Sequence, residues 1–154
     1  QDSTVTVLDF VDHLTTMFPE IRTKSYIELR GADCAPPADA VAIAGFWRGL
    51  LDDEPTRLAV DDRLRTLDYA ELRTLQTAVA KVGLDATTSI GKVGDIAQWL
   101  VEQSYARMQR SAPDCAECLE PLVERAQRQR SLADDMLELA ERDGLNAALE
   151  LVSI

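Results

Sequence analysis

Cysteine, histidine and aromatic residues are scarce in this sequence. Its 154 residues include three cysteines and one histidine, and aromatic residues make up 5%. Three cysteines cannot all pair within one chain, and no closely spaced set of four or six is present, so the sequence excludes a disulfide scaffold and predicts a reducing, cytoplasmic location. The single histidine, His13, excludes a His-rich metal site.

Long apolar runs and an excess of cations are absent as well. The longest apolar run, Ala40 to Trp47, is far shorter than the ~20 residues that cross a bilayer. The first residues do not have the basic, apolar and small-residue pattern of a signal peptide, so we do not expect secretion. There are 16 Lys and Arg residues against 27 Asp and Glu residues, a formal net charge of −11. Because such a surface repels nucleic-acid phosphates and anionic lipids, we expect neither nucleic acid nor a membrane as a partner.

Helical periodicity is present over most of the chain. Apolar residues make up 46%, enough for the core of one domain of ordinary size. The spacing predicts helices over residues 5–18, 38–52, 55–66, 68–82, 93–110, 114–130 and 132–151, and a loop over 85–94. Thr6 with Asp9 and Ser131 with Asp134 are predicted capping boxes, and Asp68 is a predicted N-cap. Pro19 and Gly83 are predicted to end helices.

One segment, residues 21–30, has a period of two and is the only predicted strand. One of its faces collects cations, a phenol and a carboxylate: Arg22, Lys24, Tyr26, Glu28 and Arg30. The other is apolar and β-branched enough to be buried: Ile21, Thr23, Ser25, Ile27 and Leu29. The fold class that follows is α+β and mostly helical. We expect residues 1–154 to be a single domain or a fragment of a longer protein, with a helix plus strand over 1–35 and a helical region over 36–154.

The charged face of this strand is the sharpest candidate site. Arg22, Lys24 and Arg30 suit an anionic ligand that lies along the sheet, such as a nucleotide triphosphate or an amino-acid carboxylate. Glu28 between them is the hard oxygen ligand that Mg²⁺ requires, with phosphate oxygens and waters completing the octahedron. The alternative interpretation is an exposed strand face crosslinked by salt bridges.

The same region resembles a known family. Its motifs are DHLTTMFPEIRTK at residues 12–24, YIELRGAD at 26–33 and FWRGLLD at 46–52. They closely resemble glutamate–cysteine ligase of the plant and proteobacterial type, whose motifs read D-H-L-T-T-x-F-P-E-V-R-x-K, Y-L-E-x-R-G-A-D and F-W-x-G-L-L-Y-D. The resemblance is strong over residues 8–53, and a match this dense is far more specific than one short motif.

The resemblance implies an ATP-dependent ligase with a glutamine-synthetase-like fold. Such an enzyme joins L-glutamate and L-cysteine through γ-glutamyl phosphate, in the first step of glutathione biosynthesis. By resemblance, Glu28 is a Mg²⁺ ligand on an active-site strand, and Arg30 and Arg22 are catalytic residues facing glutamate or the transferring phosphoryl group. Lys24 and Arg22 would bind ATP.

The resemblance also bears on the extent of the chain. The family's other metal-binding glutamates and much of its nucleotide site precede such a segment, whereas this chain opens directly into it at Gln1. We therefore expect the chain to be the carboxyl-terminal part of the ligase, with the upstream part as a missing partner. A rival hypothesis is a non-catalytic helical interaction module derived from that fold, because an acidic surface and amphipathic helices suit partner binding equally well.

Other residues give weaker signals. Cys115 and Cys118 form a lone CxxC, without the further ligands of a zinc site or the βαβ context of a thioredoxin motif. We expect Trp47, Trp99 and Tyr105 to be core anchors on apolar helix faces. The charged runs over 52–54 and 125–130 are interpreted as solvated helix ends.

Overall fold

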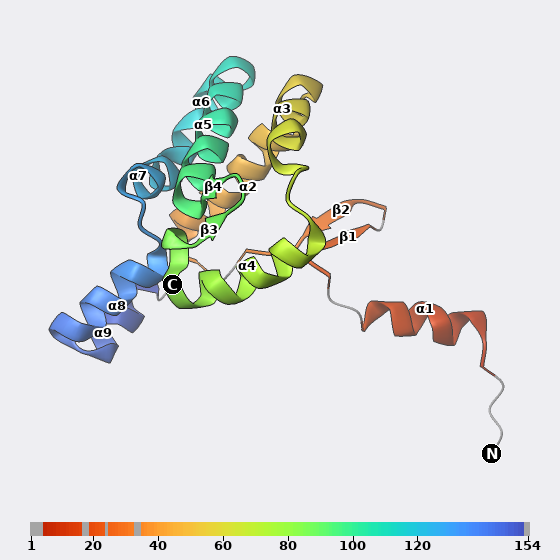
Figure 1. The fold of residues 1–154 in the computed structure, drawn as a ribbon, viewed down its shortest axis with the longest axis horizontal. Helices are drawn as coiled ribbons and strands as arrows, with labels where there is room; N and C mark the ends of the chain where they lie inside the picture. The colour runs from red at the N-terminus through yellow and green to blue at the C-terminus, as the bar shows by residue number, and fades with distance from the viewer. Residues whose placement is uncertain (1–4, 17–18, 24, 33–34, 153–154) are drawn as a thin grey trace. The chain divides into compact units, whose positions relative to one another are not determined.

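A computed structural model of the chain describes residues 5–16, 19–23, 25–32 and 35–152 (Figure 1). The chain forms two compact units, residues 1–34 and residues 35–154. The mostly helical α+β composition agrees with the prediction.

The first unit contains one helix and one β-hairpin. Helix α1 (Val7–Thr15) begins after Thr6, whose hydroxyl accepts a hydrogen bond from the Asp9 N–H at 3.2 Å, while the Asp9 carboxylate accepts one from the Thr6 N–H at 2.7 Å. The predicted capping box is therefore confirmed. Its hydrogen bonds hold the pKa of the Asp9 carboxyl below its usual range.

The predicted strand over 21–30 is a hairpin rather than one continuous strand. Strand β1 (Ile21–Thr23) pairs antiparallel with β2 (Ile27–Leu29), and the register places Arg22 opposite Glu28. The period of two could not reveal the turn. In this register even positions pair with even positions, so each residue keeps the face that a continuous strand would give it.

The apolar face of the hairpin is not buried, contrary to the prediction. Ile21 and Ile27 are 58% and 65% exposed, whereas the Arg22, Glu28 and Arg30 side chains are 20%, 32% and 24% exposed. No described residue of the first unit is buried, so that unit has no layer of its own to cover the apolar face. The charged side chains lose exposure because ion pairing draws them together over the strands.

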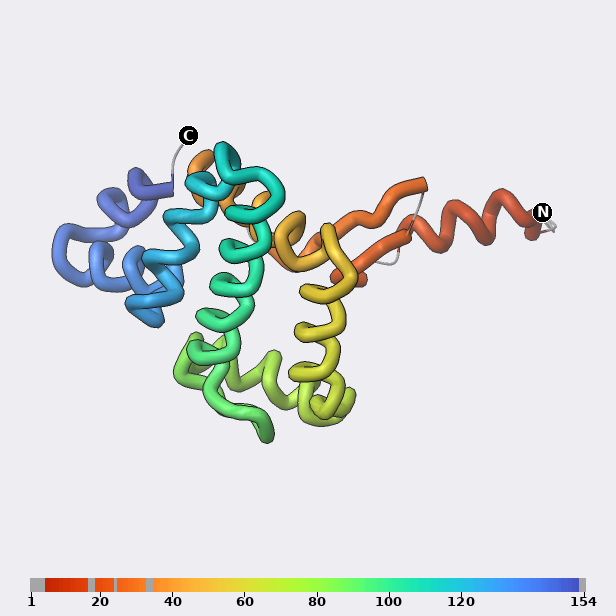
Figure 2. The backbone as a smooth tube through the Cα atoms, turned by 90° about the horizontal axis from the view of Figure 1, so that it is seen from above, coloured from red at the N-terminus to blue at the C-terminus, as the bar shows by residue number. Residues whose placement is uncertain are grey.

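The second unit is a helical array with one small hairpin. Its helices are α2 (Pro37–Leu51), α3 (Glu54–Leu64), α4 (Tyr69–Val82), α5 (Val93–Ser111), α6 (Pro113–Ala116), α7 (Glu120–Arg128), α8 (Leu132–Asp143) and α9 (Leu145–Val152), with 3-10 turns η1 (Gly83–Asp85) and η2 (Glu117–Leu119). Helices α2 to α5 lie within two residues of their predicted bounds. The Asp68 cap and the Ser131–Asp134 capping box are confirmed. Helix α4 lies across the space between the ends of α3 and α5 (Figure 2).

Two predicted helices are broken. The helix expected over 114–130 divides into α6, η2 and α7, because Pro121 has no N–H to donate to the carbonyl four residues earlier. The helix expected over 132–151 ends at Gly144, whose φ of 91° is left-handed, and α9 follows. The loop expected over 85–94 contains the short strands β3 (Thr87–Thr88) and β4 (Gly91–Lys92), so the prediction of a single strand in the chain is wrong.

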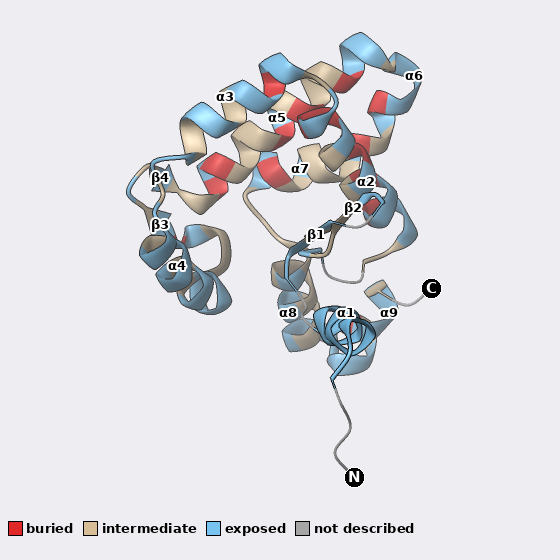
Figure 3. Cartoon of the chain, turned by 90° about the vertical axis from the view of Figure 1, so that its right-hand side faces the viewer, coloured by how far each residue is buried: buried red, intermediate tan, exposed pale blue. Residues whose placement is uncertain are grey.

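The core of the second unit lies where α2 and α5 meet the α6–η2–α7 segment (Figure 3). Its buried centre is Met108, Ala116 and Leu119, with Phe46 and Tyr105 packed against it. Tyr105 is therefore an anchor, as predicted. The two tryptophans are half-buried, as Tyr105 is, but they are not among the described residues packed against that centre. Trp47 lies beside Phe46, and the Arg63 guanidinium lies 4.4 Å from the centroid of the Trp99 ring.

Helices α2 and α5 approach each other closely at Gly49. A Cβ on Gly49 would lie 2.6 Å from the Ser104 carbonyl oxygen and 2.9 Å from the Ser104 Cα. The fully buried Ser104 hydroxyl donates a hydrogen bond to the Phe46 carbonyl at 2.9 Å. The small residue at position 49 is what allows this contact.

Candidate functional site

The charged face of the hairpin forms a cluster of three side chains, Arg22, Glu28 and Arg30, called here the hairpin cluster. The Arg22 Nε donates a hydrogen bond to Glu28 Oε2 at 2.8 Å, and Arg22 Nη2 lies 2.7 Å from the same oxygen. Arg30 Nη1 lies 3.9 Å from Glu28 Oε1. One carboxylate therefore lies between two guanidinium groups.

Strand pairing explains this arrangement. Arg22 on β1 is directly opposite Glu28 on β2, and the alternation of the strand places Arg30 on the same face two residues later. The Arg30 N–H donates to the Glu20 carbonyl at 2.8 Å, which extends the pairing beyond β2 and fixes the Arg30 backbone. The structure thus brings together three of the five residues that the sequence assigned to one face.

Of the other two residues, one differs from the prediction and one lies outside the residues that the structure describes. Tyr26 is in the bend between the strands and is 59% exposed, so it does not extend the alternating face. Lys24, the predicted ATP-binding lysine, lies outside the described residues.

The hairpin cluster has the chemistry of an anion site. Within the cluster itself, two guanidinium groups and one carboxylate sum to a positive charge, and the half-burial of the side chains strengthens their field relative to bulk water. A guanidinium has five donors in a rigid fork, so one that binds Glu28 can also bind a carboxylate or phosphate. The same ion pairs equally fit the alternative of a salt-bridged strand face.

No metal-binding group is complete within the part of the chain that the structure describes. There, no three His, Cys, Asp or Glu side chains are grouped as ligands of one ion. Cys115 is exposed and Cys118 half-buried, both as free thiols. Glu28 can supply one carboxylate to a metal, and within the described residues it does not belong to a group of three or more such ligands.

A second charged cluster joins α2, α7 and α8, and the sequence did not predict it. The Arg125 guanidinium lies 3.3 Å from the buried Asp39 carboxylate and 2.6 Å from that of Asp135. Arg130 reaches Asp135 at 3.0 Å and Glu138 at 2.6 Å. Partial burial acts to raise the pKa of Asp135, but hydrogen bonds from Arg130 and Arg125 hold it below its usual range.

The interpretation of both charged runs as solvated helix ends is therefore wrong in part. Arg125 is half-buried in this cluster. In the other run, Asp53 caps α3 by accepting the Thr56 N–H at 3.0 Å, and its carboxylate pairs with Arg107. One feature of the sequence could have indicated this charged cluster: Asp39 is an acid within an otherwise apolar segment, so its carboxylate needs a partner.

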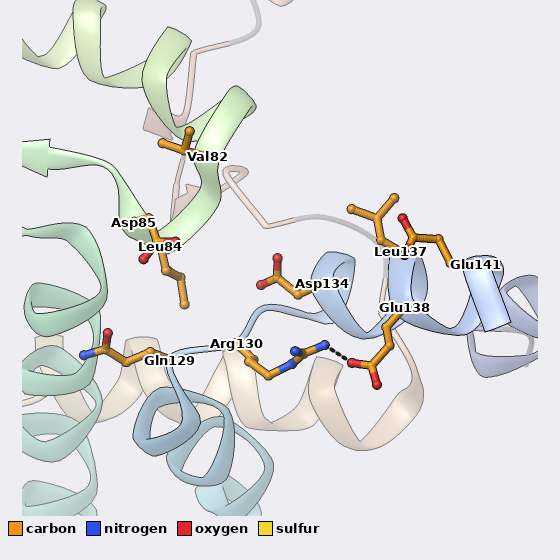
Figure 4. Close-up of a pocket in the computed structure, with 9 residues that line it drawn as sticks. All are labelled: Val82, Leu84, Asp85, Gln129, Arg130, Asp134, Leu137, Glu138 and Glu141. Atoms are coloured by element: carbon orange, nitrogen blue, oxygen red, sulfur yellow. Dashed lines mark hydrogen bonds and ion pairs between the residues drawn. The ribbon is translucent and has the colours of Figure 1, made fainter.

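A cleft of about 360 Å³ lies between the η1 turn and α8 (Figure 4). Arg130 projects into it and pairs with Glu138, while the other charged residues that line it are acidic: Asp85, Asp134, Glu138 and Glu141. Because four carboxylates outweigh one guanidinium, this cleft repels anionic ligands. It is therefore a poor candidate for binding a nucleotide or an amino-acid carboxylate.

The structure also bears on membrane association. Across the described ranges, none of the helices combines the length and apolar character needed to cross a bilayer.

A family model and individual relatives both match this chain, and both carry the same enzyme name. The model of the family described as Glutamate-cysteine ligase family 2 matches residues 1–150. Glutamate–cysteine ligase A, chloroplastic, of Oryza sativa subsp. indica is 36% identical over 105 residues, which are 68% of this chain and 21% of the rice protein. Glutamate–cysteine ligase, chloroplastic, of Nicotiana tabacum is 32% identical over 134 residues, 87% of this chain and 26% of the tobacco protein.

The chain thus spans about a fifth to a quarter of the length of these relatives. The family match covers almost all of it, including the hairpin cluster and the helices of the second unit. The resemblance inferred from the motifs is confirmed, and the chain belongs to Glutamate-cysteine ligase family 2.

Proposed function

We propose that this chain is the carboxyl-terminal part of an ATP-dependent glutamate–cysteine ligase and supplies one side of its active site. The observation that carries the proposal is the hairpin cluster, in which Arg22 and Arg30 flank Glu28 on one face. Membership of the family and the names of the relatives support the reaction class. Their coverage supports a chain that works with further protein.

The proposed reaction has two steps. An oxygen of the glutamate γ-carboxylate attacks the γ-phosphorus of ATP, and ADP leaves, which gives γ-glutamyl phosphate. The cysteine amine then attacks the acyl carbon, inorganic phosphate leaves, and the amine loses a proton as γ-glutamylcysteine forms. Both steps concentrate negative charge on oxygen atoms, so catalysis depends mainly on positioning and charge compensation.

The hairpin cluster suits that requirement. Arg30 and Arg22 would act as catalytic residues that hold the glutamate carboxylate or the transferring phosphoryl group through paired N–H donors. Arg22, together with Lys24, would bind ATP phosphates. Glu28 would orient both guanidinium groups, because its two oxygens face one arginine each.

Glu28 is also proposed as a Mg²⁺ ligand. Mg²⁺ is commonly held by one or two carboxylates together with substrate phosphates and water, and a carboxylate has lone pairs enough to accept Arg22 and coordinate a cation. When bound, the ion would offset charge on the phosphate oxygens. The described residues group no three ligands around such an ion, so the remaining ligands would come from substrate and from the upstream part. The cytoplasmic location stays a proposal based on cysteine usage.

Reconstitution tests this function. We expect residues 1–154 alone to release no phosphate from ATP in the presence of glutamate, cysteine and Mg²⁺. Joining the upstream part, as a separate chain or as a fusion, should produce ADP formation that requires both amino acids. Glutamate-dependent ADP formation by the isolated chain would contradict the partial-enzyme proposal. A well-folded upstream part that fails to restore turnover would instead favour the non-catalytic interaction module.

A further inference from the structure

Helix α1 exposes a continuous apolar face. At 100° per residue, its five large apolar side chains fall on one side: Val7, Leu8, Phe10, Val11 and Leu14. They are between 40% and 79% exposed. Asp9, Asp12 and His13 occupy the other side of the helix.

A helix of this kind is not stable without a covering surface. It has 9 residues, whereas isolated helices shorter than about 12–15 residues are marginal in water. The rest of its unit does not help, because no described residue of that unit is buried. The hairpin that follows is a two-stranded sheet, which is marginal by itself. Protein from outside this unit must supply the missing apolar contacts.

We propose that the apolar face of α1 is the docking surface for the remainder of the ligase. This inference rests on the proposed function, in which the chain works with an upstream part. The relatives support that occupant, because 79% of the rice enzyme lies outside the 21% that this chain matches (100 − 21 = 79). The hairpin cluster follows α1 directly in the sequence, so docking here would also fix the cluster beside the rest of the active site.

The test compares amide hydrogen exchange in the 154-residue chain alone and in the complete ligase. We expect the α1 amides to exchange at least 100-fold more slowly in the complete ligase, because docking buries the apolar face and suppresses fraying. Exchange that is equally fast in both proteins would overturn the proposal. Strong protection in the isolated chain would also overturn it. Protection that depends on protein concentration would indicate a second copy of the chain on this face, and protection that does not would indicate the second unit of the same chain.

A pair of substitutions in the complete ligase locates the surface. Val11→Glu places a charge on the apolar face, and His13→Glu places the same charge on the polar face as the matched control. Glutamate has a helix propensity at least as high as valine or histidine, so intrinsic propensity does not explain a larger loss in V11E than in H13E. We expect V11E to lose at least tenfold of the α1 protection and H13E to lose less than twofold. Equal effects of the two substitutions would reject the apolar face as the docking surface.

These measurements require no catalysis, so they separate the two proposals. A complete protein that protects α1 and loses protection in V11E, but forms no glutamate- and cysteine-dependent ADP, would retain the docking surface and reject the ligase function. Normal turnover with unprotected α1 amides would retain the ligase function and reject the docking surface.

Discussion

Glu28 is the residue on which the hairpin cluster depends. Its carboxylate accepts the Arg22 hydrogen bond at 2.8 Å and lies 3.9 Å from the Arg30 guanidinium. Without that negative charge, the two guanidinium groups on one strand face would repel each other. Glu28 thus has two proposed roles, to position the arginines and to bind Mg²⁺, and substitutions can separate them.

Glu28→Gln keeps the shape of the side chain and removes its charge. In the complete ligase we expect kcat to fall at least tenfold, because an amide binds both Mg²⁺ and guanidinium more weakly than a carboxylate does. The Mg²⁺ concentration for half-maximal rate should rise if Glu28 is a metal ligand. The melting temperature should change little, since partly exposed ion pairs contribute little stability.

Glu54→Gln is the matched control for this substitution, because Glu54 is an exposed carboxylate in the first turn of α3. Its turnover and its Mg²⁺ dependence should match those of the unsubstituted enzyme. Near-normal turnover of E28Q at ordinary Mg²⁺ would remove Glu28 from the metal site.

Arg30→Lys preserves charge and removes the planar fork. Steady-state kinetics of the complete ligase should show kcat/KM lowered by about tenfold or more, the cost of roughly one charge-assisted hydrogen bond. A decrease of less than twofold would favour the salt-bridged strand face, in which lysine serves as well as arginine.

At the scale of elements, the contact between α2 and α5 organises the second unit. Gly49 on α2 faces Ser104 on α5, and a Cβ there would lie within 3 Å of two Ser104 backbone atoms. Backbone atoms cannot rotate away as the end of a flexible side chain can. The two helices would have to separate to admit a larger residue.

Gly49→Ala tests this packing. Alanine gains about 1 kcal/mol of helix propensity over glycine, but overpacking costs about 1–3 kcal/mol. Because the clash is with backbone, we expect a net loss of unfolding free energy, measured by denaturant titration of the 154-residue chain. Gly31→Ala is the control, since its Cβ would meet only the flexible Glu20 carboxylate at 3.0 Å. Stabilisation by G49A would contradict the close approach of α2 and α5.

At the scale of the whole molecule, the net charge of −11 coexists with carboxylates that are fixed by hydrogen bonds or ion pairs. The pKa values of Asp9, Asp53, Asp134 and Asp135 all lie below the usual range in the folded chain. A carboxyl group with a lowered pKa in the folded state stabilises that state above its unfolded pKa, near 3.9. The contribution is lost as the pH falls through the folded pKa, so we expect stability to decrease below about pH 4.

Asp135→Asn isolates one contribution to this acid sensitivity. At pH 7 it should lower the unfolding free energy by about 1–2 kcal/mol, because Arg125 and Arg130 lose a charged acceptor. The difference from the unsubstituted chain should shrink as the pH falls below about 4, where Asp135 becomes protonated anyway. Thermal or denaturant unfolding from pH 7 to pH 3 measures both.

Asp62→Asn is the comparison for this measurement, because the Asp62 side chain is 65% exposed and forms an ion pair with Arg65, three residues along the chain. Its stability should follow the unsubstituted chain at every pH. A gap between D135N and the unsubstituted chain that stays constant to pH 3 would refute the assignment.

Features that depend on neighbours within about four residues were predictable from the amino-acid sequence. Thr6 with Asp9 and Ser131 with Asp134 form capping boxes as predicted, because each box joins residues three positions apart. Helices α2 to α5 follow from helical periodicity and end signals. The motifs identified the family, and the parity of Arg22, Glu28 and Arg30 placed them on one face.

Which segments meet and which faces are covered depends on long-range packing, which local sequence patterns do not encode. A period of two is the same for one strand and for this hairpin, so the turn after β1 could not be read from it. Arg125 and Asp39 lie 86 positions apart, beyond the reach of any local pattern. The exposure of Ile21 and Ile27 depends on whether another layer of protein covers them, and the pattern of alternation carries no information about that layer.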